Sequence, residues 1–415
     1  MMLVFISDLH LTDGSSGETI NSGAFQKFTL RLEDMVNNAK AKSVEIVLLG
    51  DIFDVIRSSI WNDTTIRPWS GPLGKDSNGK TLEKITNEIV DKICKLDENK
   101  KSVKFLTDFA ETMKAKNVKV EYTYVVGNHD WLINRYPETR EKIANFLGMS
   151  SEQYKNEKFL LEKYAPDYKV FARHGDLYDD FNYDNDRDAS SLGDAIVIEL
   201  LNKFPRAVRE ELGAGTDTDL INSLNEIDNV RPLLDAPLWV HGACKRAKNR
   251  SEGDKVKAVW NRLVDEFIGN GFVQEHNRRW TFDIVDKLEA VLKISKGFSL
   301  SDIVKFPLKY MDVGESGYEE NAYNENLMKS NNAEYIVYGH THDHKVLPLD
   351  IVPNGNGNMN KMYFNTGTWR KVHKKTTYDE KNFEFLGWHV MTFLAFYLEE
   401  ERGSYKYEVW NGVLG

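Results

Sequence analysis

The chain has 415 residues, of which 41% are hydrophobic and 28% charged, and its 54 Lys and Arg against 64 Asp and Glu give a formal charge of -10. This ordinary globular composition excludes a disordered, collagen-like or coiled-coil protein, and the length predicts about two or three compact units. The negative charge disfavours a protein that coats nucleic acid, because phosphates would be repelled everywhere except at a local basic groove or a bound cation.

Cysteine content and apolar runs indicate the compartment. The two cysteines, Cys94 and Cys244, are too few for a disulfide framework or a four-cysteine zinc site, which is typical of a reducing compartment. The apolar N-terminus meets Asp8 before the apolar part of a signal peptide can form. No later apolar stretch reaches the roughly 20 residues that span a bilayer. We therefore expect a cytoplasmic protein without a transmembrane segment, and the sequence predicts no particular oligomeric state.

Apolar runs rich in β-branched residues alternate with amphipathic stretches, which is typical of an α/β fold. In chain order, strands are expected over residues 3–7, 44–49, 118–126, 168–172, 335–338, 363–366, 385–397 and 405–410. Helices are expected over residues 25–39, 82–93 and 105–113, with a long ordered loop at 57–80. From 185 to 330 the strand pattern stops, and stripes of apolar residues at helical spacing predict a helical insertion. The predicted division is therefore a core in two parts, 1–184 and 331–415, separated by an insertion, 185–330.

The polar residues that follow the predicted strands can all bind a metal ion or carry a proton. They are Asp8, His10, Asp51, Asp54, Asn128, His129, Asp130, His174, Asp176, His340 and His342. In open α/β sheets, functional sites lie beyond the carboxyl ends of strands, so residues far apart in sequence can meet there. Imidazoles, carboxylates and an amide oxygen suit zinc, manganese, iron or magnesium, and the absence of thiolate argues against copper(I) or iron–sulfur centres. The pattern predicts a metal site.

Five short blocks carry a resemblance to a known family. They are Asp8-Leu9-His10, Gly50-Asp51-Ile52-Phe53-Asp54, Gly127-Asn128-His129-Asp130, His174-Gly175-Asp176 and Gly339-His340-Thr341-His342. In this order they resemble the calcineurin-like metallophosphoesterase superfamily, over residues 1–180 and 333–370. The resemblance implies a β-sandwich flanked by helices, with the insertion as a helical cap. Gly50, Gly127 and Gly339 are expected to let the backbone turn sharply beneath the site.

The resemblance implies a centre of two divalent ions, which would be manganese, zinc, iron or magnesium. It assigns the first ion to Asp8, His10, Asp51 and His342, and the second to Asp51, Asn128, His174 and His340. Asp51 would bridge the ions, and a hydroxide shared between them would attack phosphorus. His129 would stabilise the phosphoryl oxygens or protonate the leaving group, and Asp54 would orient it. Asp130 and Asp176 would support ligands without binding metal.

Two of these assignments have alternatives. Asp54 could instead cap the segment that follows it. His241, in Trp239-Val240-His241-Gly242, is a second histidine that precedes a glycine and could take the place of His174. We favour His174 because a predicted strand precedes it and Asp176 follows it.

The blocks also bear on the substrate. Asp54 is followed by Val55 and Ile56, not by the Arg-Gly of the protein-phosphatase branch, and the third block ends in Asp130 where that branch has Glu. The blocks look more like those of nucleases, phosphodiesterases and UDP-2,3-diacylglucosamine pyrophosphatases, although these lipid-sugar pyrophosphatases usually have arginine where His129 stands. The resemblance therefore implies a phosphodiester or pyrophosphate substrate.

Other functions remain as alternatives. A DNA or RNA nuclease would need a basic track leading to the metals, which the negative charge disfavours, and a phosphomonoesterase would use the same ligands. A metal-binding scaffold without turnover would be expected to lack His129 or a bridging ligand. The insertion contains a basic run, Lys245, Arg246, Lys248 and Arg250, that is either a docking site for an anionic substrate or a solvated helix face.

Overall fold

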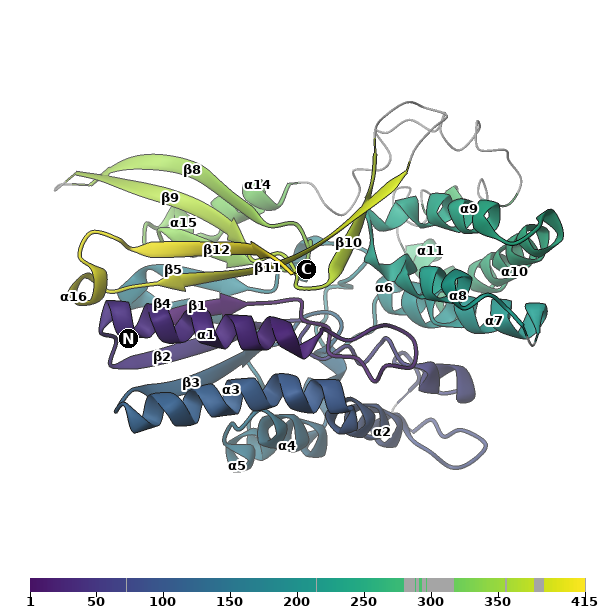
Figure 1. Ribbon diagram of the computed structural model, residues 1–415, viewed down its shortest axis with the longest axis horizontal. Coiled ribbons are helices and arrows are strands. Elements are labelled where there is room, and N and C mark those ends of the chain that lie inside the picture. The colour runs from purple at the N-terminus through teal and green to yellow at the C-terminus, as the bar shows by residue number, and fades with distance from the viewer. Residues whose placement is uncertain are drawn as a thin grey trace.

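The structure is a computed structural model that describes residues 1–71, 73–213, 215–279, 288, 291, 292, 296, 317–354, 357–376 and 384–414. Two β-sheets pack face to face, and helices cover their outer faces (Figure 1). This arrangement confirms the predicted α/β sandwich flanked by helices.

The larger sheet has seven strands in the order β3-β2-β1-β11-β10-β6, with β12 paired to β11. Its strands are β1 (Met2–Ile6), β2 (Ser43–Leu49), β3 (Lys119–Val125), β6 (Val230–Arg231), β10 (Lys371–Lys375), β11 (Phe385–Phe396) and β12 (Tyr407–Val413). β1, β2 and β3 are parallel, so their carboxyl ends meet at one edge of the sheet, and β11 runs antiparallel to β1.

The smaller sheet has five strands in the order β4-β5-β7-β9-β8. These strands are β4 (Glu162–Ala165), β5 (Val170–Arg173), β7 (Tyr335–Tyr338), β8 (Lys345–Asn354) and β9 (Gly357–Asn365). The central strands β5, β7 and β9 are parallel. The chain leaving β5 and β7 therefore emerges at a common edge, as it does in the larger sheet.

Alternating side chains of β1 fix the two sheets against each other. Leu3 and Phe5 are fully buried between the sheets, where they share a cluster with Val170, Val337 and Phe364. The intervening residues of β1 point to the opposite face, where helices cover the sheet. Each such apolar side chain contributes roughly 1.5–3 kcal/mol when fully buried. The strand ends that carry the polar loops are thus held by a rigid core.

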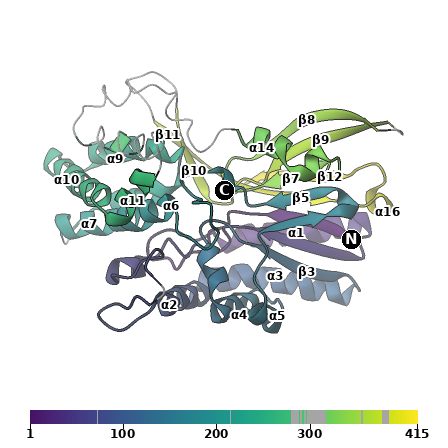
Figure 2. The ribbon, with the colours of Figure 1, turned by 180° about the vertical axis from the view of Figure 1, so that it is seen from behind.

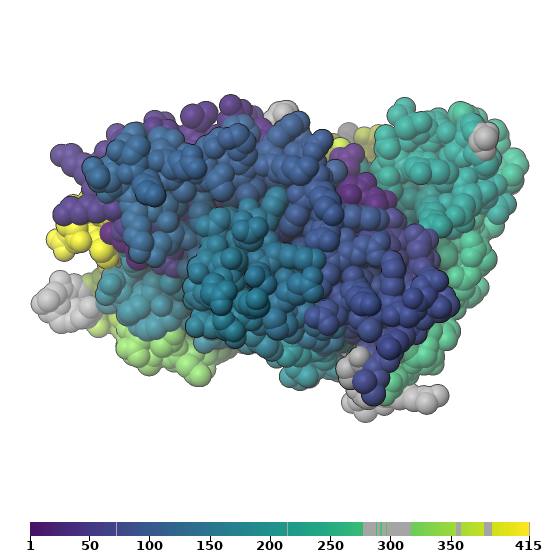
Figure 3. Space-filling view, turned by 90° about the horizontal axis from the view of Figure 1, so that it is seen from below, coloured from purple at the N-terminus to yellow at the C-terminus, as the bar shows by residue number. Residues whose placement is uncertain are grey.

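Helices of the first 156 residues lie on the outer side of the larger sheet, and the last of them buries no residue of its own and packs on the helix before it. They are α1 (Ser22–Ala39), α2 (Leu82–Lys95), α3 (Asp97–Ala115), α4 (Pro137–Phe146) and α5 (Ser151–Asn156). In α1, Phe25, Phe28 and Leu32 recur on one face and are buried. The Asn21 side chain accepts a hydrogen bond from the Gly23 amide and starts this helix. Seen from below, the blue residues of α2 to α5 form one broad surface, and the teal helices adjoin it at one end (Figure 3).

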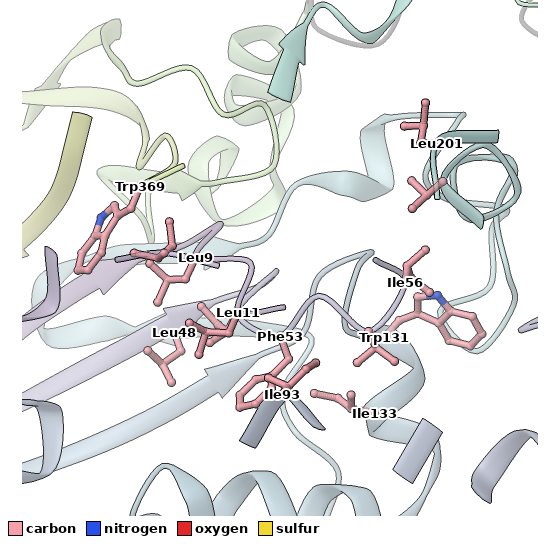
Figure 4. Close-up of a cluster of buried hydrophobic side chains, with 14 of the residues drawn as sticks. Leu9, Leu11, Leu48, Phe53, Ile56, Ile93, Trp131, Ile133, Leu201 and Trp369 are labelled. Carbon is pink, nitrogen blue, oxygen red and sulfur yellow. The ribbon is translucent and has the colours of Figure 1, made fainter. Parts of the chain in front are cut away.

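The inserted helices form a lobe at one end of the sandwich (Figure 2). They are α6 (Leu192–Ala195), followed by a π-helical turn (Ile196–Leu201), α7 (Lys203–Leu212), α8 (Thr218–Asn225), α9 (Ala236–Arg246), α10 (Arg250–Ile268) and α11 (Gly271–Arg279). Leu201 of this lobe lies above Ile56 and Trp131 of the core, within one continuous apolar cluster (Figure 4). In addition, β6 pairs with β10. The lobe is therefore packed onto the core.

Two further helices of the 185–330 segment pack elsewhere. α14 (Tyr318–Asn324) and α15 (Asn326–Lys329) lie on the smaller sheet, where Tyr318 and Met328 are buried with Ile336 and Tyr363. The expected boundary at residue 330 therefore does not coincide with the packing, because residues from 317 onward cover a core sheet. The parts of the insertion at 280–287, 289–290, 293–295 and 297–316 lie outside the described residues. The short helix α16 (Glu399–Arg402) precedes β12. Within the described ranges, no helix has the length and apolarity needed to cross a membrane.

Candidate metal centre and active site

The loops after β1, β2, β3, β5 and β7 bring the candidate ligands together. The structure forms three groups whose ligand atoms lie within 4.8 Å of one another, namely Asp8 with His10 and His342, His10 with Asp51 and His129, and Asp51 with His174 and His340. The groups share His10 and Asp51, so they form one cluster. His241, the alternative to His174, lies in α9 and belongs to none of the three.

Several of these residues have a strained backbone. Positive φ angles occur at Asp8 (51°), His10 (46°), Asp51 (54°), His340 (70°) and His342 (59°). This left-handed region is uncommon for residues other than glycine and costs on the order of 1–3 kcal/mol at each position. Such strain persists only where the surrounding structure imposes it, and it gathers at functional sites. Here the packed strands hold each loop in the conformation that turns its side chain inward.

Glycines allow other chain segments to approach these side chains. A Cβ atom at Gly127 would lie 2.3 Å from Asp51 Oδ1, and one at Gly339 would lie 2.5 Å from Asp8 Oδ2. Gly50 has a positive φ of 84°, and a Cβ there would lie 2.3 Å from His174 Nδ1. The sharp turn expected at all three glycines thus applies to Gly50. Gly127 and Gly339 are required because the backbone passes directly against a carboxylate.

We expect Gly127→Ala to lower both metal content and stability, the latter by about 1–3 kcal/mol, because the added methyl group displaces Asp51. Urea unfolding and elemental analysis of the purified variant measure the two effects. Gly71→Ala is the control, since no atom lies within 4 Å of a Cβ at this exposed position. It should change stability by less than about 0.5 kcal/mol. Wild-type metal content in Gly127→Ala would contradict the assigned role of this glycine.

The first group contains two facing imidazoles. His10 Nε2 lies 3.0 Å from His342 Nε2, and His342 Nε2 lies 3.4 Å from Asp8 Oδ1. Burial lowers the pKa of His10 and holds the pKa of His342 well below its usual range. Both rings are therefore neutral at pH 7 and can offer a lone pair to a cation.

The second group contains a buried histidine nitrogen that faces a carboxylate. His174 Nδ1 donates to the Leu49 carbonyl oxygen at 2.9 Å, which leaves Nε2 pointing inward. Nε2 is buried without a hydrogen-bond partner among the described residues and lies 3.2 Å from Asp51 Oδ2. Burial opposes charge on this ring, but Asp51 and Asp8 outweigh it and hold the pKa of His174 well above its usual range. The pocket thus attracts positive charge, as expected of a cation site.

His340 and Asn128 complete the second group. Their Nδ1 and Oδ1 atoms are 2.9 Å apart, and His340 Nε2 lies 2.9 Å from Asp179 Oδ2. Together the two groups offer buried carboxylates, imidazoles and one amide oxygen. This donor set fits a divalent metal centre.

Asp54 joins two histidines. Its Oδ1 lies 2.8 Å from His129 Nδ1, and its Oδ2 lies 2.9 Å from His10 Nδ1. Oδ1 also accepts from the Arg57 amide at 3.0 Å, which closes a turn. The helical turn that follows is capped by Ser58, so Asp54 is not its N-cap, and the orienting role of Asp54 stays a prediction.

His129 carries a proton in this environment. Burial alone would lower its pKa, but the negative charges of Asp54 and Asp51 outweigh burial and raise the pKa to about 10. Its Nδ1 is held by Asp54, so Nε2 is the nitrogen available to a substrate. His129 also shares a group with His10 and Asp51, so distance alone allows it to be a ligand. Metal content of a His129 variant separates these roles.

Asp130 and Asp176 stabilise loops near the site through hydrogen bonds and an ion pair. Asp130 accepts from the Gly127 amide at 2.6 Å, the Ile52 amide at 2.9 Å and the Tyr124 hydroxyl at 2.6 Å. Burial, reinforced by the charge of Asp51, raises the pKa of Asp130 to about 6. Asp176 forms an ion pair with Arg187, with one N–O distance of 2.9 Å. Neither belongs to the three groups of ligand atoms.

A cavity of about 110 Å³ opens onto the cluster, compared with roughly 10–15 Å³ needed for one water on this measure. Side chains of the cluster, including Asp51, His129 and His342, contribute to its lining. Aliphatic side chains of the inserted lobe, including Leu200 and Leu234, contribute the apolar part. The site therefore has room for a substituent on the phosphoryl group.

The basic run lies outside this cavity. Lys245 and Arg246 end α9, and Arg250 begins α10. With Lys248 they are exposed, and none of the four lines the cavity. Docking of an anionic substrate on this run stays a prediction.

Several residues that contact the site were not predicted from the sequence. Arg370 Nη1 lies 3.1 Å from Asp228 Oδ2 and 3.8 Å from Asp54 Oδ2, and Arg57 Nε lies 3.6 Å from Asp228. Arg231 Nη2 lies 2.9 Å from His342 Nδ1. Asp228 and Arg231 belong to the insertion, where no block marks them. Asp179 follows the His174 block closely, which is a weak signal for its contact with His340.

Comparison with known proteins agrees with this geometry. The family model of calcineurin-like phosphoesterases matches residues 1–344, a range that includes the inserted lobe. A search of curated proteins matched none to this chain. The matched range covers most of the chain and contains the whole His and Asp cluster. The chain therefore belongs to the calcineurin-like phosphoesterases and is a metal-dependent phosphoric ester hydrolase.

Proposed function

We propose that the chain hydrolyses a phosphodiester or pyrophosphate bond with two divalent ions, which are manganese, zinc, iron or magnesium. The proposed ligands are Asp8, His10, Asp51, Asn128, His174, His340 and His342. The observation that carries this proposal is the position of Asp51. Its Oδ2 lies 3.2 Å from His174 Nε2 and 3.9 Å from His10 Nε2, so one carboxylate faces both groups. This position supports a bridging role.

Two bound ions roughly 3.5–4 Å apart would supply a hydroxide of lowered pKa and neutralise charge on the phosphoryl oxygens. Overall, an oxygen from water forms a new bond to phosphorus while the bond to the leaving group breaks. His129 gives its Nε2 proton to the departing oxygen, and Asp54 holds the opposite nitrogen during the transfer. Bound cations would lower the pKa of His129 toward neutrality, where a general acid works best.

The charge of the cavity favours a diester over a monoester. Among the described lining residues, Arg231 is the one Arg or Lys, whereas Asp51, Asp179 and Asp228 are acidic. A diester carries one negative charge and a monoester close to two, so, beyond the charge that the bound ions would supply, this lining compensates a diester better than a monoester. The same lining has no basic track of the kind that a nuclease needs.

We expect bis(p-nitrophenyl) phosphate to be hydrolysed with at least roughly tenfold higher kcat/KM than p-nitrophenyl phosphate, which corresponds to about 1.4 kcal/mol of transition-state binding. Both substrates are assayed after loading with each of the four metals. Protein treated with a chelator is the control and should be inactive until metal is restored. Faster hydrolysis of the monoester would assign the chain to the phosphomonoesterases.

A further inference from the structure

Arg231 comes from the inserted lobe and reaches the candidate active site. It lies in β6, where it pairs in register with Lys374 of β10. This pairing anchors the inserted chain to the core sheet at that point. Arg231 lines the same cavity as Asp51, His129 and His342. The five sequence blocks do not include it.

The guanidinium of Arg231 has neutral partners. Its Nη1 donates to the carbonyl oxygens of Asp228 at 2.7 Å and Val230 at 2.9 Å, and its Nη2 donates to His342 Nδ1 at 2.9 Å. The Asp228 carboxylate is paired with Arg370 instead. No ion pair involves Arg231 within the described part of the chain. Because arginine stays charged in proteins, a positive charge without a directly bonded carboxylate lies at the cavity wall, although the Asp228 carboxylate feels this charge.

The contact with His342 cannot coexist with metal binding by that ring. A neutral imidazole has one N–H and one lone pair, and arginine can only donate. The observed contact therefore uses the His342 lone pair. When His342 gives its lone pair to a metal ion, Arg231 Nη2 loses this acceptor. A donor at the cavity wall is then free for an anion.

We propose that Arg231 is a catalytic residue that binds non-bridging oxygens of the phosphoryl group. The proposal rests on the proposed hydrolysis of a phosphate ester. The planar guanidinium can donate two parallel hydrogen bonds to two oxygens, a geometry that lysine lacks. Arg231 transfers no proton, so the balance of the reaction is unchanged. It stabilises negative charge as the bond to the leaving group breaks.

The test compares Arg231→Met and Arg231→Lys with Lys374→Met in the metal-loaded protein. Arg231→Met should lower kcat/KM for bis(p-nitrophenyl) phosphate by about 10²–10³-fold, as loss of a charge-stabilising donor does in other enzymes. Arg231→Lys should lower kcat/KM less, because lysine keeps the positive charge but cannot donate two parallel hydrogen bonds. Lys374→Met removes a positive charge from the paired position on the adjacent strand and should stay near wild type. Metal content and melting temperature should match wild type in all three.

Two further measurements separate binding from structural support. Guanidinium chloride at low millimolar concentration should restore activity to Arg231→Ala at least about tenfold and leave wild type unchanged, because the small cation fills the vacated space. Calorimetry should show that inorganic phosphate binds the metal-loaded wild type more tightly than Arg231→Met or Arg231→Lys. Should the Met variant fail to fold, the Lys variant carries the comparison.

Loss of metal together with activity, or equal phosphate affinity in wild type and variants, would overturn the role of Arg231. An equal loss in Lys374→Met would do the same, because the effect would then be general electrostatics. Phosphate binding that depends on Arg231, without hydrolysis of either ester, would contradict the proposed function and retain the phosphoryl contact. Absence of both binding and hydrolysis in wild type would contradict both.

Discussion

Asp51→Asn is expected to lose metal from both positions and to lower diester turnover by at least about 10³-fold, because the lowered pKa of water depends on the bound ions. The Asp51 side chain is buried, and its Oδ1 accepts from the His129 amide at 2.8 Å. Asparagine keeps the shape but removes the negative charge that faces both groups. Elemental analysis and steady-state kinetics on the same preparation measure the two losses.

Two variants accompany this measurement. His10→Ala should weaken mainly the first position, because His10 is assigned to that ion alone. Asp76→Asn is the control for a buried aspartate, since this carboxylate accepts from the Asn78 and Lys80 amides in the 57–80 loop. It should keep wild-type metal content. An Asp51→Asn protein with full metal content would contradict the bridging role.

His129→Ala is expected to lower turnover by roughly 10²–10⁴-fold while metal content stays near wild type. The reason is that His129 Nδ1 is held by Asp54 at 2.8 Å, which leaves Nε2 available to a substrate. The measurement again pairs elemental analysis with kinetics on the diester. His389→Ala is the control, because this imidazole contacts the Trp369 carbonyl oxygen and belongs to none of the three groups.

Metal content and turnover of His129→Ala also distinguish an enzyme from a metal-binding scaffold that catalyses no reaction. Loss of metal with activity in His129→Ala would place this residue among the ligands, as its group with His10 and Asp51 allows. Unchanged turnover of the diester would remove His129 from the mechanism. A loss of turnover at full metal content is the outcome that a scaffold without catalysis cannot give.

The sequence predicted the buried parallel strands well. β1, β2 and β3 agree with prediction within one residue at either end. β1 and β2 are buried on both faces and read as continuous apolar runs, whereas β3 is a half-exposed edge strand that is recognised by its valines and tyrosines. β4 and β8 were missed since they are edge strands with mixed polar composition. β10 was missed because lysines make up much of it. The apolar stripes that predicted the inserted helices do not specify which surface they cover, so α14 and α15 were grouped with the lobe.

The site residues that could be predicted from the sequence are metal-binding residue types that lie within the five short blocks. Asp8, Asp51 and His174 each follow a predicted strand, and the strand order brings them together. Arg231 and Asp228 could not be predicted, because their contacts depend on the path that a long insertion takes back to the sheet. The basic run shows the converse. Its composition suggested an anion site, but its four side chains lie on the lobe surface outside the cavity.

The number of bound metal ions distinguishes a centre of two ions bridged by Asp51 from a site that holds a single ion. The protein is purified without chelator, stripped, and titrated with each divalent metal while bound metal per chain and hydrolysis of bis(p-nitrophenyl) phosphate are followed together. We expect about two ions per chain, with full activity reached only when the second position fills. Saturation at one ion per chain with full activity, or diester hydrolysis that persists in the stripped protein, would contradict it.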